Sequence, residues 1–189
     1  KCMQKGLESA NLPINTVQLV QNTDREAVSA MLTSTGEIDI IIPRGGKSLV
    51  KKIQDEARVP VFAHLEGICH IYVDKDADIN KAIKIIVNSK MRRTGICGAL
   101  ETLLIDKRIS EKAVQIIVQN LIKSGCHIRG DIDTKKILNE IELASEKDWH
   151  TEYLDAILSV KLVDGILGAM EHISKYSSNH TESIITENT

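Results

Sequence analysis

Short apolar runs alternate with amphipathic segments along this chain, and that alternation constrains the fold more than any other feature. Brief apolar runs bounded by turn residues are typical of buried strands, and helical stripes between them predict βαβ units. We therefore expect an α/β protein with a mostly parallel sheet. The expected strands are residues 17–20, 38–43, 59–64, 68–74, 101–106, 126–130, 156–164 and 183–188.

Helix-start residues precede several of the amphipathic segments. Asp78 and Ser110 stand where an N-cap is expected, and Thr23 with Glu26 has the spacing of a capping box. Gly125 is placed to end the helix that follows Ser110. We also expect helices over residues 44–57, within 134–149 and over 165–176.

The composition is that of an ordinary globular protein, with 42% hydrophobic residues in 189 and a formal net charge of −2. This balance gives no bulk attraction to nucleic acid or to an anionic membrane, and no apolar run has the length of a bilayer span. The cysteines are far apart in the sequence, which suits a reducing compartment better than a disulfide framework. We expect a cytoplasmic protein without nucleic-acid or membrane partners. The cysteines are Cys2, Cys69, Cys97 and Cys126.

Cys97 is the candidate for nucleophilic chemistry. It lies between a basic helix end, with Lys90, Arg92 and Arg93, and an apolar strand, and glycines stand on both sides of it. Cations near a sulfur favour the thiolate, which is the reactive form, and flanking glycines let backbone N–H groups approach a developing oxyanion. The alternative is a small buried cysteine beside a solvated helix end.

Two further motifs carry weaker signals. Residues 44–48, "RGGKS", follow an apolar run at the start of a helix, where N–H groups can bind an anion, but the same residues also suit a plain tight turn. His64, Glu66, Cys69 and His70 include metal-ligating types, yet alternation along a strand turns neighbours to opposite faces. We favour packing or a cleft wall there and expect no metal.

Four long segments, in order, resemble the γ-glutamyl phosphate reductase family of the aldehyde dehydrogenase superfamily. They are "IDIIIPRGGKSLV", "VPVFAHLEGICHIYVDKDAD", "KAIKIIVNSKMRRTGICGALETLLID" and "TEYLDAILSVKLVDGI". The resemblance runs almost from end to end. It implies part of a Rossmann-like dinucleotide-binding domain over residues 1–90 and an α/β catalytic domain over 91–189 that is incomplete at its C-terminus.

The resemblance also implies a reaction, the NADPH-dependent reduction of γ-glutamyl phosphate to glutamate γ-semialdehyde and phosphate in proline biosynthesis. Cys97 matches the family nucleophile, which forms a thioester that hydride then reduces. The residues that would bind the small-molecule substrate are Lys90, Arg92, Arg93 and His180. Those that would bind the cofactor are Arg44, Gly45, Gly46, Lys47, Ser48 and Glu152.

Departures from the family pattern leave other hypotheses about the function open. Family members are about twice as long, and Ser177 and Asn179 stand where they usually have glycine. One alternative is therefore a truncated or split-gene relic that is inactive alone or needs a complementing chain. A homo-oligomer is also open, as is a generic acyl-cysteine enzyme such as a thioester hydrolase.

Overall fold

The computed structural model describes residues 1–63 and 66–188 and has two compact units, which divide between residues 65 and 66. Among these residues, no helix has both the length and the apolar character needed to cross a bilayer. The first unit holds α1 (Cys2–Ser9), a 3₁₀ turn (Ile14–Thr16), α2 (Arg25–Thr33) and α3 (Lys47–Glu56).

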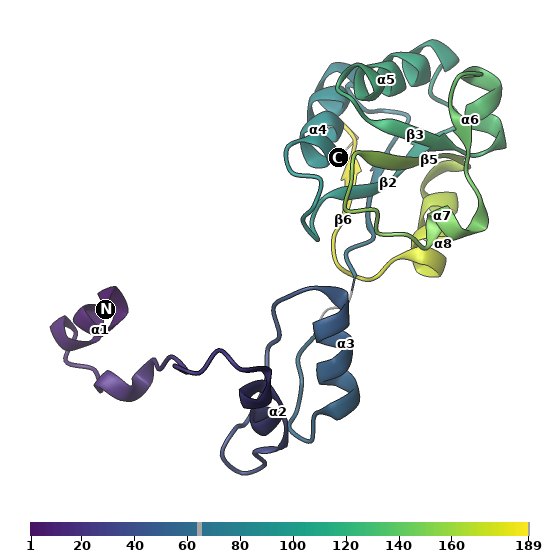
Figure 1. Cartoon of the computed structure of the whole chain (residues 1–189). Coiled ribbons are helices and arrows are strands. Elements are labelled where there is room, and N and C mark those ends of the chain that lie inside the picture. The colour runs from purple at the N-terminus through teal and green to yellow at the C-terminus, as the bar shows by residue number, and fades with distance from the viewer. Residues whose placement is uncertain (64–65, 189) are drawn as a thin grey trace. The chain divides into compact units, whose positions relative to one another are not determined.

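The second unit is built on a six-stranded parallel sheet with the order β4-β3-β5-β2-β1-β6 (Figure 1). The predicted α/β fold with a parallel sheet is confirmed. Its strands are β1 (Cys69–Val73), β2 (Leu100–Asp106), β3 (His127–Gly130), β4 (Glu142–Leu143), β5 (Ile157–Val163) and β6 (Glu182–Ile185). Its helices are α4 (Ile79–Met91), α5 (Glu111–Lys123), α6 (Ile132–Ile137), α7 (Glu146–Trp149) and α8 (Gly165–Tyr176).

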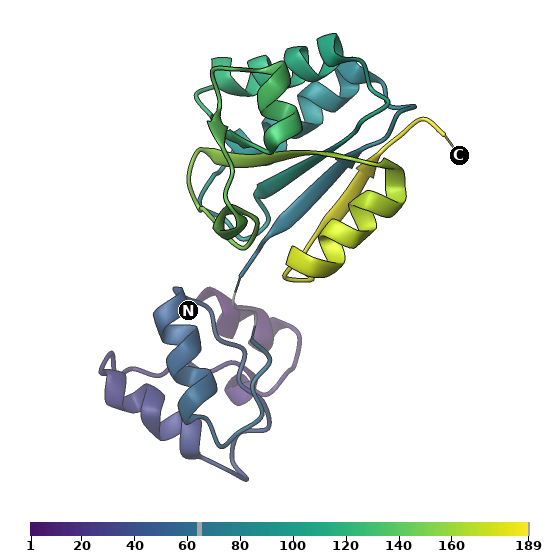
Figure 2. The same cartoon turned by 90° about the vertical axis from the view of Figure 1, so that its right-hand side faces the viewer.

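The helices cover both faces of the sheet (Figure 2). From β1 to β4 the chain steps across the sheet in one direction, and α4, α5 and α6 lie on one face. From β4 to β5 and on to β6 it steps back, and α7 and α8 lie on the other face. Right-handed crossovers require this change of face whenever the direction reverses.

The larger hydrophobic core lies between the sheet and α4 and α5. Val73, Leu103 and Ile105 are completely buried in it, together with Ile86 of α4 and Leu121 of α5. Burying one such side chain stabilises the fold by about 1.5–3 kcal/mol. The opposite face has a smaller apolar cluster, formed by Tyr72, Leu104, Val163 and Ala169.

Local signals set the ends of these helices as predicted. The Asp78 carboxylate accepts the N–H groups of Asn80 and Lys81 at 2.8 and 3.1 Å, and Ser110 accepts that of Ala113 at 3.3 Å. Gly125 follows α5 with φ +89°, a left-handed conformation that glycine adopts without strain.

Three expected strands of the first unit are absent. Residues 17–20 form no strand, and the described parts of 38–43 and 59–64 share a single parallel bridge, between Ile41 and Val61. Many of their apolar side chains remain exposed, because these runs have no sheet face on which to pack. Examples are Leu19 (80% exposed), Ile42 (59%) and Phe62 (73%).

Two helix predictions also need correction. Asp24, not Thr23, caps α2, because its carboxylate accepts the Glu26 N–H at 3.1 Å. The helix expected within 134–149 is replaced by α6, the short strand β4 and α7. Asp131 caps α6 and Ser145 caps α7. The second cap starts a new helix inside the segment that was predicted as one helix.

The boundary between compact units differs from the predicted domain boundary at residue 90. β1 and α4 precede that residue but belong to the second unit, since β1 pairs with β2 and α4 packs on the same sheet. The functional division into a cofactor-binding and a catalytic part stays a prediction.

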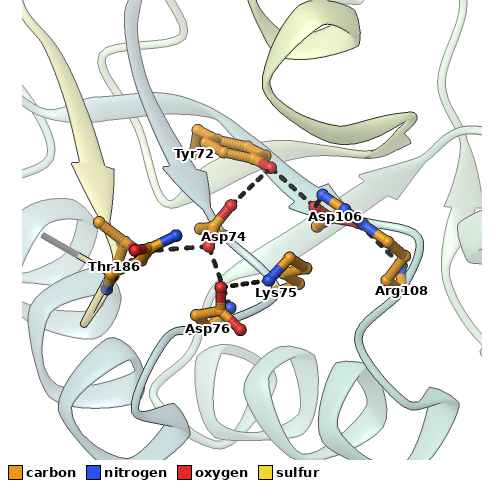
Figure 3. A network of polar contacts seen from close by, with 8 residues as sticks. Tyr72, Asp74, Lys75, Asp76, Asp106, Arg108 and Thr186 are labelled. Carbon is orange, nitrogen blue, oxygen red and sulfur yellow. Dashed lines mark hydrogen bonds and ion pairs between the residues drawn. The ribbon is translucent and has the colours of Figure 1, made fainter.

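Polar side chains tie the carboxyl ends of three strands together (Figure 3). Tyr72 donates to Asp106 at 2.8 Å, and Arg108 binds the same carboxylate through its side chain and its backbone N–H. These contacts, with Arg108 first among the causes, hold the pKa of Asp106 well below its usual range. Thr186, after β6, donates to Asp74, after β1, at 3.2 Å.

Candidate active site at the amino edge of the sheet

The segments that enter β1, β2, β5 and β6 meet at one edge, because parallel strands start on the same side of a sheet. Cys97 precedes β2, Glu152 precedes β5, and His180 precedes β6. The structure therefore gathers three predicted site residues, from distant parts of the sequence, at the amino edge. In open α/β sheets the opposite, carboxyl edge is the usual place for ligands.

Cys97 lies in a turn between α4 and β2, as predicted, and it is exposed. The buried alternative is therefore wrong. Its carbonyl oxygen faces the start of β1, where the Cys69 thiol donates to it at 3.1 Å. A Cβ built on Gly67 would lie 1.9 Å from the same oxygen, so no larger residue fits there without a backbone shift.

Cys69 is buried beneath the Cys97 turn. Burial is the main cause that raises the pKa of its thiol to about 11, so the sulfur keeps its proton near neutral pH. His180 Nδ1 lies 3.7 Å from this sulfur and 2.8 Å from the Thr181 hydroxyl. His180 thus lies beside the buried Cys69, beneath the Cys97 turn.

Side chains from distant loops hold the backbone that enters β1. Glu152 Oε1 accepts the Gly67 N–H at 2.8 Å, and Ser178 Oγ accepts the Ile68 N–H at 2.9 Å. Glu152 is buried, so this charge-assisted hydrogen bond acts in a region of low dielectric. The family resemblance implied only a cofactor role for Glu152, and this hydrogen bond adds a structural one.

The position of Lys90 does not suit the substrate-binding role predicted for it. Its ammonium is fully buried and donates to Glu101 Oε2 at 2.8 Å, while Glu101 Oε1 accepts the Leu154 N–H at 3.3 Å. Burial is the main cause that raises the pKa of Glu101, and Lys90 opposes it. The pair fixes the end of α4 against the start of β2, and no Lys90 donor is exposed for a substrate.

Arg92 and Arg93 keep the position that the prediction needs. Both are exposed in the loop that leads to Cys97, and neither guanidinium has an ion-pair partner among the residues the structure describes. Arg92 also closes α4, donating its backbone N–H to Asn88 at 3.2 Å. They stay candidates for binding an anionic group beside the thiol.

Two residues near the site have left-handed backbone conformations that non-glycine residues rarely adopt. Asn179 has φ +58°, and asparagine is among the few residues that tolerate this region. The substitution of glycine by asparagine therefore leaves the left-handed turn in place. Ser177, at φ −67°, needs no glycine, whereas Leu154 at φ +53° is strained.

The predicted cofactor residues of the glycine turn belong to the first unit. Gly46 is the N-cap of α3 and supplies no capping side chain, and Arg44, Gly45 and Ser48 are exposed. Around this turn, the N–H groups of Lys47 and Ser48 have no backbone acceptor in the described part of the chain. The start of α3 is thus free to bind an anion.

Among the described residues, no group of three or more His, Cys, Asp or Glu side chains is arranged to hold a metal ion. The suggested zinc ligand His64 lies outside the described residues. Cys69 contacts the Cys97 turn, while the His70 ring lies on the opposite face of the sheet, beside His172 and with Nδ1 3.1 Å from Glu182. These two residues therefore belong to different sites.

Sequence reasoning missed the roles of Gly67, Glu101 and Ser178 in the site, and it gave Cys69 only as packing or a cleft wall. Only Glu101 carried a usable signal, because an acidic residue inside a buried apolar strand needs a partner. The contacts of the other three depend on which strands are neighbours in the sheet, and the local pattern of apolar residues does not predict that order.

The candidate site is thus an exposed cysteine in the turn that enters β2 of a parallel sheet. Residues 2–142 match the model of the aldehyde dehydrogenase family, and the chain therefore belongs to that family. The resemblance read from the sequence motifs is confirmed.

The particular relatives are γ-glutamyl phosphate reductases. The chain is 56% identical to that of Brucella suis over 99% of its own length, and 59% identical to that of Rhizobium etli over 98%. It covers 45% and 44% of those proteins, less than half of their length. The crystal structure of γ-glutamyl phosphate reductase from Thermotoga maritima matches with a TM-score of 0.88 and 41% identity, over 98% of this chain and 45% of that one.

Proposed function

We propose that this chain carries the acyl-accepting centre of a γ-glutamyl phosphate reductase, with Cys97 as the nucleophile. The observation that carries the proposal is the exposed Cys97 in a turn fixed by Gly67 and Cys69. The reductases of Brucella suis and Rhizobium etli support the choice of substrate, γ-glutamyl phosphate, because they match nearly the whole chain.

The chemistry follows from the groups at the amino edge. The Cys97 thiolate attacks the γ-carbonyl carbon, the bond to the phosphate oxygen breaks, and phosphate leaves as a thioester forms. Arg92 and Arg93 are exposed cations in the same loop, suited to bind the departing phosphate. His180 lies at the same edge and would contact the substrate. Lys90 acts through Glu101 and positions the turn instead.

The proposed cofactor is NADPH, which supplies the hydride that takes the thioester to the aldehyde level. The start of α3 fits a phosphate group, because its first N–H groups are uncapped and glycines at 45 and 46 keep side chains away. Arg44 and Ser48 would extend this contact, together with the backbone N–H of Lys47. Glu152 would hold ribose hydroxyls while it also accepts the Gly67 N–H.

A second candidate is a chain that accepts the acyl group but completes no reduction alone. The observation that favours it is coverage of only about 45% of the related reductases. Activity would then require a complementing chain or a homo-oligomer. The four unpaired cysteines suit a reducing compartment, so we propose a cytoplasmic location for either form.

Two measurements on the 189-residue protein separate these candidates. Acetyl phosphate, a stable acyl phosphate, should add one acetyl group to Cys97, seen by peptide mass spectrometry and lost in Cys97→Ser. In the reverse reaction, NADPH formation from the semialdehyde, phosphate and NADP⁺ is expected only from a complete reductase.

Acylation of Cys97 without NADPH formation supports the second candidate. Recovery of NADPH formation on adding a relative's missing segment would then identify complementation. Equal acetylation of Cys97 and the exposed reference thiol Cys2 by acetyl phosphate would count against both candidates.

A further inference from the structure

The Cys97 carbonyl group is held from two sides by the start of β1. The Cys69 thiol donates to its oxygen at 3.1 Å. Gly67 lies so close that a Cβ there would be 1.9 Å from the oxygen and 2.7 Å from the carbonyl carbon. The carbonyl is therefore fixed with its oxygen turned into the protein.

This orientation determines where the next backbone N–H points. No peptide bond among the described residues is cis, so the C=O of Cys97 and the N–H of Gly98 point in opposite directions. The Gly98 N–H is thus directed away from Cys69. Both residues are exposed, and a Cβ built on Gly98 would meet no atom within 4 Å.

The two N–H groups beside the Cys97 sulfur are also free of backbone partners. Within the described part of the chain, neither Cys97 nor Gly98 donates its N–H to a backbone carbonyl. Acyl transfer to a thiol places negative charge on the former carbonyl oxygen of the substrate. Fixed backbone N–H groups near the nucleophile are the usual means of stabilising that oxyanion.

We propose that Cys69 is a positioning residue for acyl transfer, holding the Cys97 carbonyl inward so that the Gly98 N–H faces the substrate and stabilises the oxyanion. The inference rests on the proposed function, in which Cys97 accepts an acyl group.

The surroundings of Cys69 suit a fixed hydrogen-bond donor. It is the first residue of β1, and its backbone pairs with Leu100 at the start of β2, so the strand pairing positions its sulfur. Burial raises the pKa of the thiol to about 11, which keeps the proton that the hydrogen bond needs. Cys69 makes no bond to substrate in this scheme.

The test compares two reactions of Cys97 in the 189-residue protein. p-Nitrophenyl acetate transfers an acetyl group: the Cys97 sulfur bonds to the carbonyl carbon, an oxyanion forms, and nitrophenolate leaves. Iodoacetamide alkylates the same sulfur by displacing iodide, without an oxyanion. Peptide mass spectrometry gives both rates at Cys97, with the exposed Cys2 as an internal reference thiol.

Cys69→Ala is expected to lower the ratio of acylation to alkylation at Cys97 about tenfold, a part of the effect of deleting an oxyanion donor. Cys69→Ser keeps a donor and is expected to retain most of the ratio. Cys126→Ala is the matched control, because Cys126 is a second buried thiol, which lies just before β3, two strands away from β2 on the side opposite β1.

A second pair of variants tests the N–H directly. Gly98→Pro removes it and should lower the ratio at least as far, whereas Gly98→Ala keeps it and has space for its methyl group. An unchanged ratio in Cys69→Ala and Gly98→Pro would overturn the proposal, as would an equal fall in Cys126→Ala.

The test is independent of the proposed substrate. Transfer from the ester needs neither phosphate nor cofactor, so the ratio stays measurable if acetyl phosphate fails to acylate Cys97. That failure would count against the proposed function alone.

Discussion

Leu154 shows how the site constrains a single residue. Its φ of +53° lies in the left-handed region, where the Cβ of a leucine approaches the following carbonyl oxygen. Its backbone N–H is bound to Glu101, whose other oxygen is bound to Lys90. The buried ion pair thus holds the strained backbone that leads from Glu152 into β5.

Relieving this strain is expected to stabilise the protein. Leu154→Gly should raise the free energy of unfolding by up to about 1 kcal/mol, because glycine adopts positive φ freely and Leu154 is 42% exposed. Urea denaturation followed by circular dichroism measures the change. Leu154→Ala keeps the Cβ and is the control, with no gain expected; an equal gain in both variants would show that strain is not the cause.

At the scale of the elements, α4 and β2 are joined by an ion pair rather than by apolar contacts alone. Lys90 and Glu101 are both completely buried and 2.8 Å apart. Removing both charges is often tolerated, whereas removing one leaves a buried charge without compensation.

Lys90→Met is therefore expected to lower the free energy of unfolding by about 3–5 kcal/mol. The double variant Lys90→Met, Glu101→Gln should recover most of this loss, because the amide oxygen still accepts the Leu154 N–H. Urea denaturation measures both. Lys84→Met, at an exposed position of α4, is the control with little effect. Similar stability of Lys90→Met and the parent protein would argue against this role.

α8 carries a pH-sensitive contact with the sheet. His172 is 3% exposed and packs against Trp149 and Tyr176 with ring centroids 5.3 and 4.5 Å away. Burial is the main cause that lowers its pKa to about 3, and the charge of Lys161 adds to it. The other charged or titratable groups that act on it are His70, Lys175 and Glu146.

This pKa shift predicts a loss of stability in acid. As the pH falls, the unfolded histidine binds a proton near pH 6.5, whereas the folded one does so only near pH 3. The contribution of neutral His172 to the free energy of unfolding is therefore complete above about pH 6.5 and is lost between about pH 6.5 and 3. Within this window the free energy of unfolding should fall by about 1.4 kcal/mol per pH unit, the value for uptake of one proton. His172→Phe should flatten the stability curve in this window, whereas His127→Phe, at an exposed position, should not. Parallel curves for both variants and the parent would refute the assignment.

For the whole molecule, the core lies almost entirely in the second unit. Of the residues that the structure describes, five buried hydrophobic ones belong to the first unit and 29 to the second. The one tryptophan of the chain, Trp149, is buried in the second unit and reports on it selectively. The two units should therefore unfold separately.

A protein of residues 66–189 is expected to fold alone. Its urea midpoint, measured by Trp149 fluorescence, should match that of the full chain, because the sheet and its helices lie within it. In the full chain, circular dichroism should show an additional, earlier transition from the helices of the first unit. An unfolded 66–189 protein would contradict the independence of this unit.

The sequence predicted elements better than their arrangement. Each strand of the second unit except β4 was expected, since long apolar runs and the caps at Asp78 and Ser110 are local signals. The strands predicted in the first unit were wrong, because an apolar run such as 38–43 has the pattern of a strand whether or not neighbouring strands form a sheet with it. Cys97 was identifiable, but the Cys69 and Gly67 contacts depend on strand order, which only long-range packing decides.

The candidate site lies where loops lead into the strands, and this position has a consequence for folding. β6 takes its place at the margin of the sheet by pairing with β1, and Ser178 and His180 arrive with it. Until that strand docks, the Ile68 N–H lacks its Ser178 acceptor and the Cys69 sulfur lacks its His180 neighbour, however well the other strands have formed. Alkylation of the Cys69 sulfur should thus slow when β6 docks, and its rate should report on closure of the sheet.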